Sequence, residues 1–176
     1  MARRRELLAL GFVLVLSLPG CGWAPLYADP QSSPASGDLR AIQVLPISER
    51  IGQRLETALR NSLNPTGEPT KFLYALHTTL TVSLSALGIQ SQGTATLGRI
   101  DVSASFVLVD NRNGSTLLSN SAHVQNSFAL NANQYSTIVG EDDARLRSVA
   151  ELNQEIMTRL TLFMEHRAAQ SAPKTS

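Results

Sequence analysis

Cysteine is almost absent from this 176-residue chain, which contains a single one. One thiol cannot form a disulfide within the chain or a multi-thiolate zinc or iron–sulfur site. No apolar run reaches the roughly 20 residues that a membrane-spanning helix needs, so a multispan membrane protein is excluded. Gly (11) and Pro (8) are few and 43% of the residues are hydrophobic, which excludes collagen-like and wholly disordered chains. The length leaves room for one domain.

The first twenty residues have the pattern of a bacterial lipoprotein signal. An arginine-rich segment precedes about a dozen apolar residues. Leu18-Pro19-Gly20-Cys21 then resembles the lipobox, whose Cys is diacylated before signal peptidase cuts ahead of it. We expect residues 1–20 to be removed and Cys21 to carry lipid; the alternative is an ordinary secretory signal with an incidental Cys. Gly22 follows, where an Asp would favour retention in the inner membrane, so we expect the outer membrane.

The chain that remains after removal of the signal has no large excess of positive or negative charge. The signal contains three of the 15 basic residues and one of the 14 acidic residues, which leaves 12 and 13 and a formal charge of −1. Proteins that grip a nucleic-acid backbone usually carry a clustered positive surface. Nucleic-acid binding is therefore disfavoured.

Composition divides the mature chain into three parts. Residues 21–37 combine the acylated N-terminus with a Pro- and Ser-rich segment that lacks a hydrophobic period, as a tether does. Residues 168–176 are similarly polar, and we expect a disordered tail. The folded domain is predicted to span residues 38–167.

Hydrophobic periodicity predicts the elements of this domain. Residues 39–45 fit a short strand that ends at Pro46. Ser48 can cap a following amphipathic helix that stops at Asn64-Pro65, with an apolar residue at every fourth position: Ile51, Leu55, Leu59 and Leu63. Alternating apolar residues then predict three strands, within 72–89, 99–108 and 118–128, joined by turns at 88–93 and 110–114.

A long final helix is predicted after a polar loop at 131–137. The acidic residues Glu141, Asp142 and Asp143 are placed at its N-terminus, where the helix dipole favours negative charge. An apolar stripe continues to about Glu165. The resulting order, β-α-β-β-β-α, predicts an α+β two-layer sandwich with two helices on one face of a four-stranded sheet. The sheet is expected to be mixed and mostly antiparallel, because a helix separates its first strand from the other three.

Catalytic and metal-binding patterns are missing from the sequence. His77, His123 and His166 form no metal spacing, although sequence alone leaves open that His77 and His123 meet in the sheet. Gly88 and Gly93 have the glycine spacing of a P-loop, but Thr94-Ala95 replaces the Lys-Ser/Thr pair that binds phosphate and magnesium. No nucleophile elbow occurs. We therefore expect no metal, no cofactor and no enzymatic activity.

Two segments resemble the LPS-assembly lipoproteins of the LptE family. Cys21-Gly22-Trp23-Ala24-Pro25-Leu26-Tyr27 is similar to the mature N-terminus of alphaproteobacterial members, and residues 135–145, YSTIVGEDDAR, are similar to the entry to the last helix. The resemblance covers nearly the whole mature chain. It implies two helices on a four-stranded sheet, in agreement with the order derived from periodicity.

The resemblance also implies a function and partners. Such a lipoprotein plugs the β-barrel of the outer-membrane LPS translocon, supports its assembly and assists LPS insertion into the outer leaflet, with its domain in the barrel lumen on the periplasmic side. Arg or Lys side chains would bind the lipid A phosphates, and Arg99 and Arg112 are the candidates near predicted loops. The alternative is a free-standing periplasmic lipoprotein, either a regulator of cell-wall synthesis or an auxiliary of an ABC transporter, because anchored α+β domains also serve these roles.

Overall fold

The computed structural model describes residues 36–89 and 95–171. Its elements are α2 (Ser36–Arg40), β1 (Ile42–Val44), α3 (Arg50–Leu63), β2 (Tyr74–Ile89), β3 (Ala95–Asp110), β4 (Thr116–Ala129) and α4 (Gln134–Ser171). Apart from the short α2, this is the predicted order. The predictions for Cys21, for residues 21–35 of the tether and for the turn at residues 90–93 concern residues outside the described ranges. Ser36 and Gly37, which the predicted tether includes, lie in α2.

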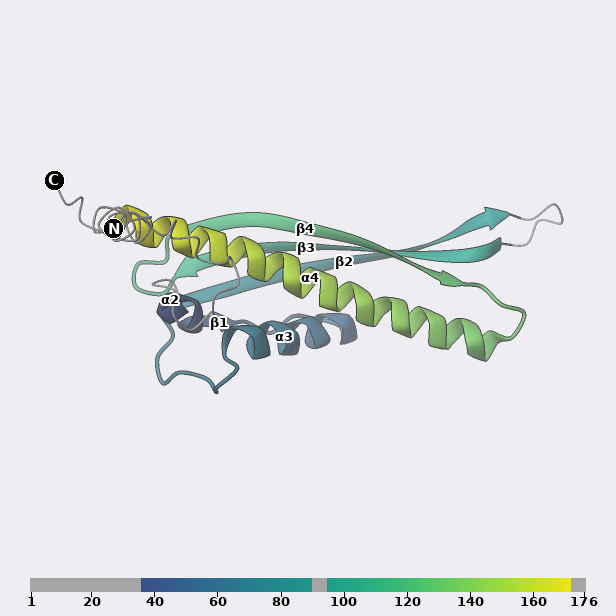
Figure 1. The fold of residues 1–176 in the computed structure, drawn as a ribbon, viewed down its shortest axis with the longest axis horizontal. Helices are drawn as coiled ribbons and strands as arrows, with labels where there is room; N and C mark the ends of the chain where they lie inside the picture. The colour runs from purple at the N-terminus through teal and green to yellow at the C-terminus, as the bar shows by residue number, and fades with distance from the viewer. Residues whose placement is uncertain (1–35, 90–94, 172–176) are drawn as a thin grey trace, which may run out of the picture. The chain divides into compact units, whose positions relative to one another are not determined.

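The four strands form one mixed sheet in the order β1-β2-β3-β4 (Figure 1). β1 pairs with β2 in parallel, while β2–β3 and β3–β4 pair antiparallel. The turn between β3 and β4 is the predicted one, and Gly114 adopts a φ of 71°, which favours glycine. The predicted fold class, including the mixed sheet, is confirmed.

α3 and α4 pack on one face of the sheet, and the core lies between the two layers. β3 shows the alternation most clearly, because its even-numbered residues from Ile100 to Leu108 are fully buried. The predicted apolar row of α3 is buried against this face, as are Leu152, Ile156 and Leu160 of α4. The opposite face of the sheet, formed by the odd-numbered residues of β2, β3 and β4, carries no helix among the described elements; we call it the open face.

The prediction for the start of the last helix was wrong. α4 begins at Gln134, and Asn133 Oδ1 accepts a hydrogen bond from Tyr135 N–H (3.0 Å), as an N-cap does. The acidic group at Glu141 therefore lies two turns inside the helix, beyond the reach of the terminal dipole. Its residues instead form ion pairs, each with a different Arg. α4 also continues to Ser171, past the expected start of the tail at residue 168.

Two smaller boundaries also differ from the predictions. Leu39 belongs to α2 rather than to the first strand, which is limited to Ile42–Val44. Ser48 does not cap α3, because Glu49 occupies the N-cap position with a φ of 68° and without a side-chain cap bond. The approach to α3 is held instead by Ile47 N–H, which donates to Glu56 Oε2 (3.1 Å).

Two glycines near Phe128 should respond in opposite ways to replacement by alanine. A Cβ on Gly98 would lie 2.7 Å from Phe128 Cε2, so Gly98→Ala should lower stability by about 1–3 kcal/mol through overpacking. Gly140 lies within α4, and its Cβ would meet Phe128 Cβ at an ordinary 3.6 Å. Gly140→Ala should therefore raise stability by about 0.5–1 kcal/mol through helix propensity. Denaturant unfolding measures both changes; equal signs would contradict this packing.

Candidate interaction surfaces

Small neutral polar side chains form the middle of the open face, and apolar residues such as Leu97, Val107 and Val109 lie toward its ends. Period-two alternation directs them away from the helices along the three long strands. The polar residues are all exposed or half-buried: Thr79, Thr81, Ser83 and Ser85 on β2, Ser103 and Ser105 on β3, and Ser119, Ser121 and Ser127 on β4. Such a surface can exchange hydrogen bonds with a polar wall or with water, at little cost in desolvation.

Charge on the open face is confined to one small network. Arg99 Nε donates to Asp101 Oδ2 (3.0 Å), and Asp101 Oδ1 lies 3.8 Å from His123 Nε2. His123 Nδ1 is also hydrogen-bonded to Ser103 Oγ (2.9 Å). The Ser–His–Asp combination lacks an oxyanion hole, because the neighbouring backbone N–H groups of β3 belong to the sheet ladders. The network therefore orients polar groups on this face.

His77 and His123 do not meet in the sheet. His77 pairs with Val107, whereas His123 pairs with Ser103 on the other side of β3. No group of three or more His, Cys, Asp or Glu residues suited to a metal ion occurs in residues 36–89 and 95–171. Within the same ranges, no helix is long and apolar enough to cross a membrane.

The two predicted phosphate-binding arginines lie at opposite ends of the sheet. Arg99 is near the start of β3, whereas Arg112 is in the hairpin after its end. Asp110 follows Arg99 by eleven positions along β3, about 36 Å at roughly 3.3 Å per residue. Each arginine is paired with an aspartate two positions away, Asp101 or Asp110. The structure therefore does not bring Arg99 and Arg112 into one site.

Asp110 anchors the hairpin through Arg112. Its buried carboxylate accepts hydrogen bonds from Arg112 Nη2 (2.6 Å), Nε (3.0 Å) and backbone N–H (2.9 Å). These bonds, from the guanidinium first and the backbone second, lower the pKa of Asp110 from 3.8 to about 2.

Asp110→Asn should therefore have a pH-dependent effect on stability. Because the pKa of Asp110 is lower in the folded state, the ionised carboxylate stabilises the wild type above pH 4, and this contribution is lost between about pH 4 and pH 2. We expect the difference in Tm between wild type and Asp110→Asn to be largest near neutral pH and to shrink across that window. A difference that stays constant down to pH 2 would contradict a salt-bridged Asp110.

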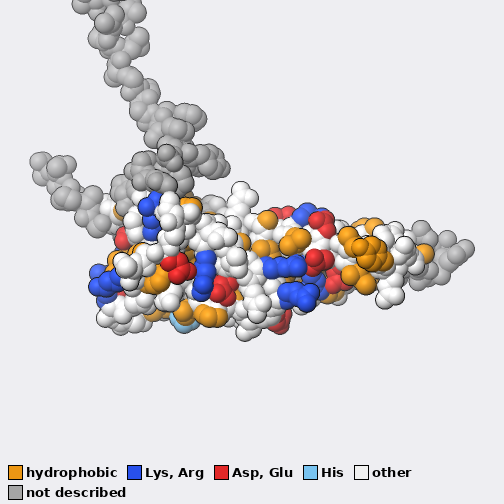
Figure 2. All heavy atoms as spheres, turned by 90° about the horizontal axis from the view of Figure 1, so that it is seen from below, with side chains coloured by type: hydrophobic (Ala, Val, Ile, Leu, Met, Phe, Trp, Pro, Cys, Tyr) orange, Lys and Arg blue, Asp and Glu red, His pale blue; other side chains and the backbone are white. Residues whose placement is uncertain are grey.

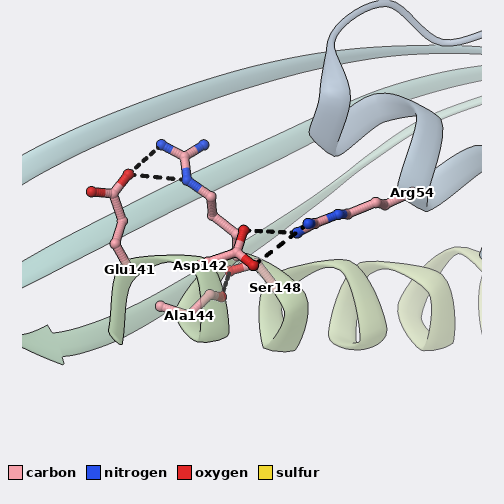
Figure 3. A network of polar contacts seen from close by, with 6 residues as sticks. Arg54, Glu141, Asp142, Ala144 and Ser148 are labelled. Carbon is pink, nitrogen blue, oxygen red and sulfur yellow. Dashed lines mark hydrogen bonds and ion pairs between the residues drawn. The ribbon is translucent and has the colours of Figure 1, made fainter. Parts of the chain in front are cut away.

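A groove of about 340 Å³ lies between the N-terminal part of α3 and the first turns of α4. Arg54 Nη1 spans it to Asp142 Oδ1 (3.0 Å), and Arg145 Nη2 pairs with Glu141 Oε1 (2.6 Å) along α4 (Figure 3). Arg50 also lines the groove. Figure 2 shows basic and acidic side chains close together on this side of the molecule, with hydrophobic side chains gathered toward one end. The exposed apolar residues of α4 in this region are Tyr135, Ile138, Val139 and Leu146.

Sequence reasoning missed this groove. The pair Glu141–Arg145 has the i,i+4 spacing of a helical ion pair and could have been found from the sequence. Arg54 and Asp142 are 88 residues apart, and only the parallel packing of α3 beside α4 brings them together.

The comparisons with known proteins agree with this architecture. A family model named LptE, with the description Lipopolysaccharide-assembly, matches residues 39–160. The chain belongs to the LptE family. The prediction drawn from the two sequence motifs is thereby confirmed, and membership in the LptE family gives the chain a role in LPS assembly. No curated protein matches the chain.

Two solved structures share the fold of this LptE-family chain. A lipoprotein from Caulobacter crescentus CB15 superposes with a TM-score of 0.61 at 19% identity, over 76% of this chain and 96% of the other. A minor lipoprotein from Acinetobacter baumannii superposes with a TM-score of 0.57 at 17% identity, over 70% of this chain and 92% of the other. At these identities the likeness concerns the fold.

Proposed function

We propose that this LptE-family protein is an outer-membrane lipoprotein that plugs the β-barrel of the LPS translocon. It supports assembly of the barrel and assists LPS insertion into the outer leaflet, without enzymatic activity. Acylated Cys21 anchors it in the membrane, and its domain enters the barrel lumen from the periplasmic side.

The observation that carries the proposal is the neutral polar middle of the open face, from Thr79 to Ser85 on β2 and across the strands paired with it. A barrel lumen is polar and water-filled, so a protein inside it needs hydrogen-bonding groups rather than an apolar surface. Unpaired charges would lose hydration against the lumen wall, whereas Ser and Thr hydroxyls exchange one hydrogen bond for another. The charged residues of the open face, Arg99 and Asp101, already neutralise each other.

Contact with LPS phosphates is proposed for Arg99 and Arg112 separately. A phosphate would have to share each guanidinium with its aspartate or displace that aspartate, and Arg112 is the more exposed of the two side chains, at 61%. Because the arginines lie at opposite ends of β3, they would contact different LPS molecules or act at different stages of passage.

Photo-crosslinking in cells tests the plug. Crosslinkers at Thr79 and Ser105 on the open face, and at Asn113 in the hairpin, should capture the translocon barrel. A crosslinker at Gln154, on the exposed side of α4, tests whether the helices also face the lumen wall, and the chain without a crosslinker is the control for nonspecific capture. Charged insertions beside Asn113, or at Gln90 outside the described residues, should lower barrel assembly while the isolated domain keeps its Tm. Crosslinks to soluble periplasmic proteins alone, with unchanged surface LPS after depletion, would instead favour the periplasmic regulator or transport accessory.

A further inference from the structure

More than half of β2 has no neighbouring strand on one side within residues 36–89 and 95–171. β1 pairs with Tyr74–Leu76, and no described strand pairs with β2 on that side from His77 to Ile89. The even-numbered residues direct their backbone groups to this side, since Tyr74 N–H donates to Ala41 O (3.1 Å) and Leu76 O accepts from Leu45 N–H (3.1 Å). The same alternation directs five N–H and five C=O groups to an edge at which no described strand pairs. They belong to Thr78, Leu80, Val82, Leu84 and Ala86. We call this segment, Thr78–Ala86, the free edge.

The other edge of the sheet is protected. Arg147 Nη2 donates to Ser127 O (3.1 Å), and Arg159 Nη1 donates to Ser121 O, so α4 places two cations on outward-facing carbonyls of β4. Charged side chains along an edge hinder the addition of another strand. β2 itself contributes no such protection, because Tyr74–Ile89 contains no Asp, Glu, Lys, Arg or Pro.

The apolar side chains of the free edge are also incompletely covered. On the helix-facing side of β2, Leu76 is fully buried, Leu80 and Val82 are half-buried, and Leu84 is 49% exposed. Ile100, paired with Leu84, is fully buried. The exposure of the helix-facing side chains therefore increases from Leu76 to Leu84 along β2, whereas the residue of β3 paired with Leu84 stays buried.

The unequal lengths of the helices explain this gradient. At 1.5 Å per residue, the 14 residues of α3 span about 21 Å, whereas the 38 residues of α4 span about 57 Å. α4 packs mainly against β4 and less extensively against β3 (Figure 1). α3 packs beside β1, at the end of the sheet where β2 starts, so the second half of β2 has no second helix over it.

We propose that the free edge binds an extended segment of the translocon barrel protein as an added β-strand. This inference rests on the proposed function and names one contact of the plug. The added strand would run along the line that β1 begins, over about 30 Å at roughly 3.3 Å per residue. Its apolar residues would lie beside Leu80, Val82 and Leu84, and its small polar residues would lie beside Thr79, Thr81 and Ser83.

A barrel protein can supply such a segment only from a part of its chain that does not form a strand of the barrel wall. In a closed barrel the wall strands already satisfy each other's backbone groups and leave no edge. The segment therefore belongs to a loop or terminal extension that reaches into the lumen, with alternating apolar and small polar residues.

A second copy of this chain fits the free edge less well. Two-fold antiparallel pairing of Thr78–Ala86 with itself would place Gly88 of one copy opposite Leu76 of the other. β1 already occupies that position beside Leu76. A separate extended segment meets no such obstacle.

Residue-resolved hydrogen exchange tests the added strand. The amides of Thr78, Leu80, Val82, Leu84 and Ala86 should exchange rapidly in the isolated protein and at least tenfold more slowly in the co-purified complex with the barrel. The odd-numbered amides of the same segment bond to β3 and should be protected in both states. This alternation distinguishes an added strand from general burial.

Two edge variants provide an independent readout. Val82→Pro removes an outward N–H without removing a ladder bond to β3, and its ring obstructs a neighbouring strand. Leu84→Lys places a charge beside the added strand; Leu162→Lys is its control, because Leu162 is similarly exposed on α4, at 55%. Both edge variants should reduce the yield of complex at least tenfold with little change in Tm, and Leu162→Lys should not.

The outcomes separate this inference from the proposed function. Even-numbered amides that stay fast in a complex still crosslinked through the open face would overturn the added strand and leave the plug intact. Protection that depends on the concentration of the isolated protein would overturn it in favour of a second copy. Failure to form any complex with the barrel would overturn the plug and this contact together.

Discussion

Leu160→Asp should prevent the domain from folding at ordinary temperatures. Leu160 is fully buried in α4 against the sheet, where a carboxylate would find no basic partner among the surrounding apolar residues. Burying it ionised costs several kcal/mol, and neutralising it by protonation still leaves a polar group in the core. A loss on the order of 4 kcal/mol or more is a large part of the stability of a domain of this size.

The matched control lies two residues further along the same helix. Leu162 is 55% exposed, so Leu162→Asp changes the same residue type to the same carboxylate without burying it. We expect a change of about 0.5 kcal/mol or less. Circular dichroism melting and denaturant unfolding of both variants measure the difference; similar melting curves would show that the face of α4 is wrongly assigned.

Cys21→Ala, made behind an ordinary secretory signal that is cleaved without acylation, should release the mature protein from the membrane. The lipobox predicts that Cys21 carries several acyl chains. Each buried CH₂ contributes about 0.8 kcal/mol, so two or more chains give a stable anchor. Removing the thiol removes the attachment point for all of them. The protein should then move from the membrane pellet to the soluble periplasmic fraction.

The domain itself should remain folded in that variant. Its core residues lie between Leu39 and Met164, all within the compact unit Ser33–Ser176, which does not include position 21. The Tm of the purified variant should therefore match that of the wild-type domain. A mature N-terminus that mass spectrometry finds unmodified in the wild type would contradict the lipid anchor.

Local sequence information predicted the elements because each one carries its own periodicity. The spacing of four residues from Ile51 to Leu63 and the alternation from Ile100 to Leu108 match the residues that are buried. Caps were harder to predict, because Ser48 and the acidic group at Glu141 were each suitable by type, while Glu49 and Asn133 occupy the positions. The positions of helix ends depend on how the flanking chain is held, as Ile47 N–H is by Glu56.

The sequence by itself determined the α+β class, the face of each strand that meets the helices and the family motifs. These properties depend on residues close together in the chain, so periods of 2 and 3.6 residues report them directly. Only the tertiary structure decided that Arg54 meets Asp142, that Arg99 and Arg112 lie far apart, and that Arg147 and Arg159 protect β4 while β2 is left open. Those results depend on the order of the strands in the sheet, on the sheet edge beside which α4 packs and on the difference in length between α3 and α4. No local sequence pattern encodes how these elements combine.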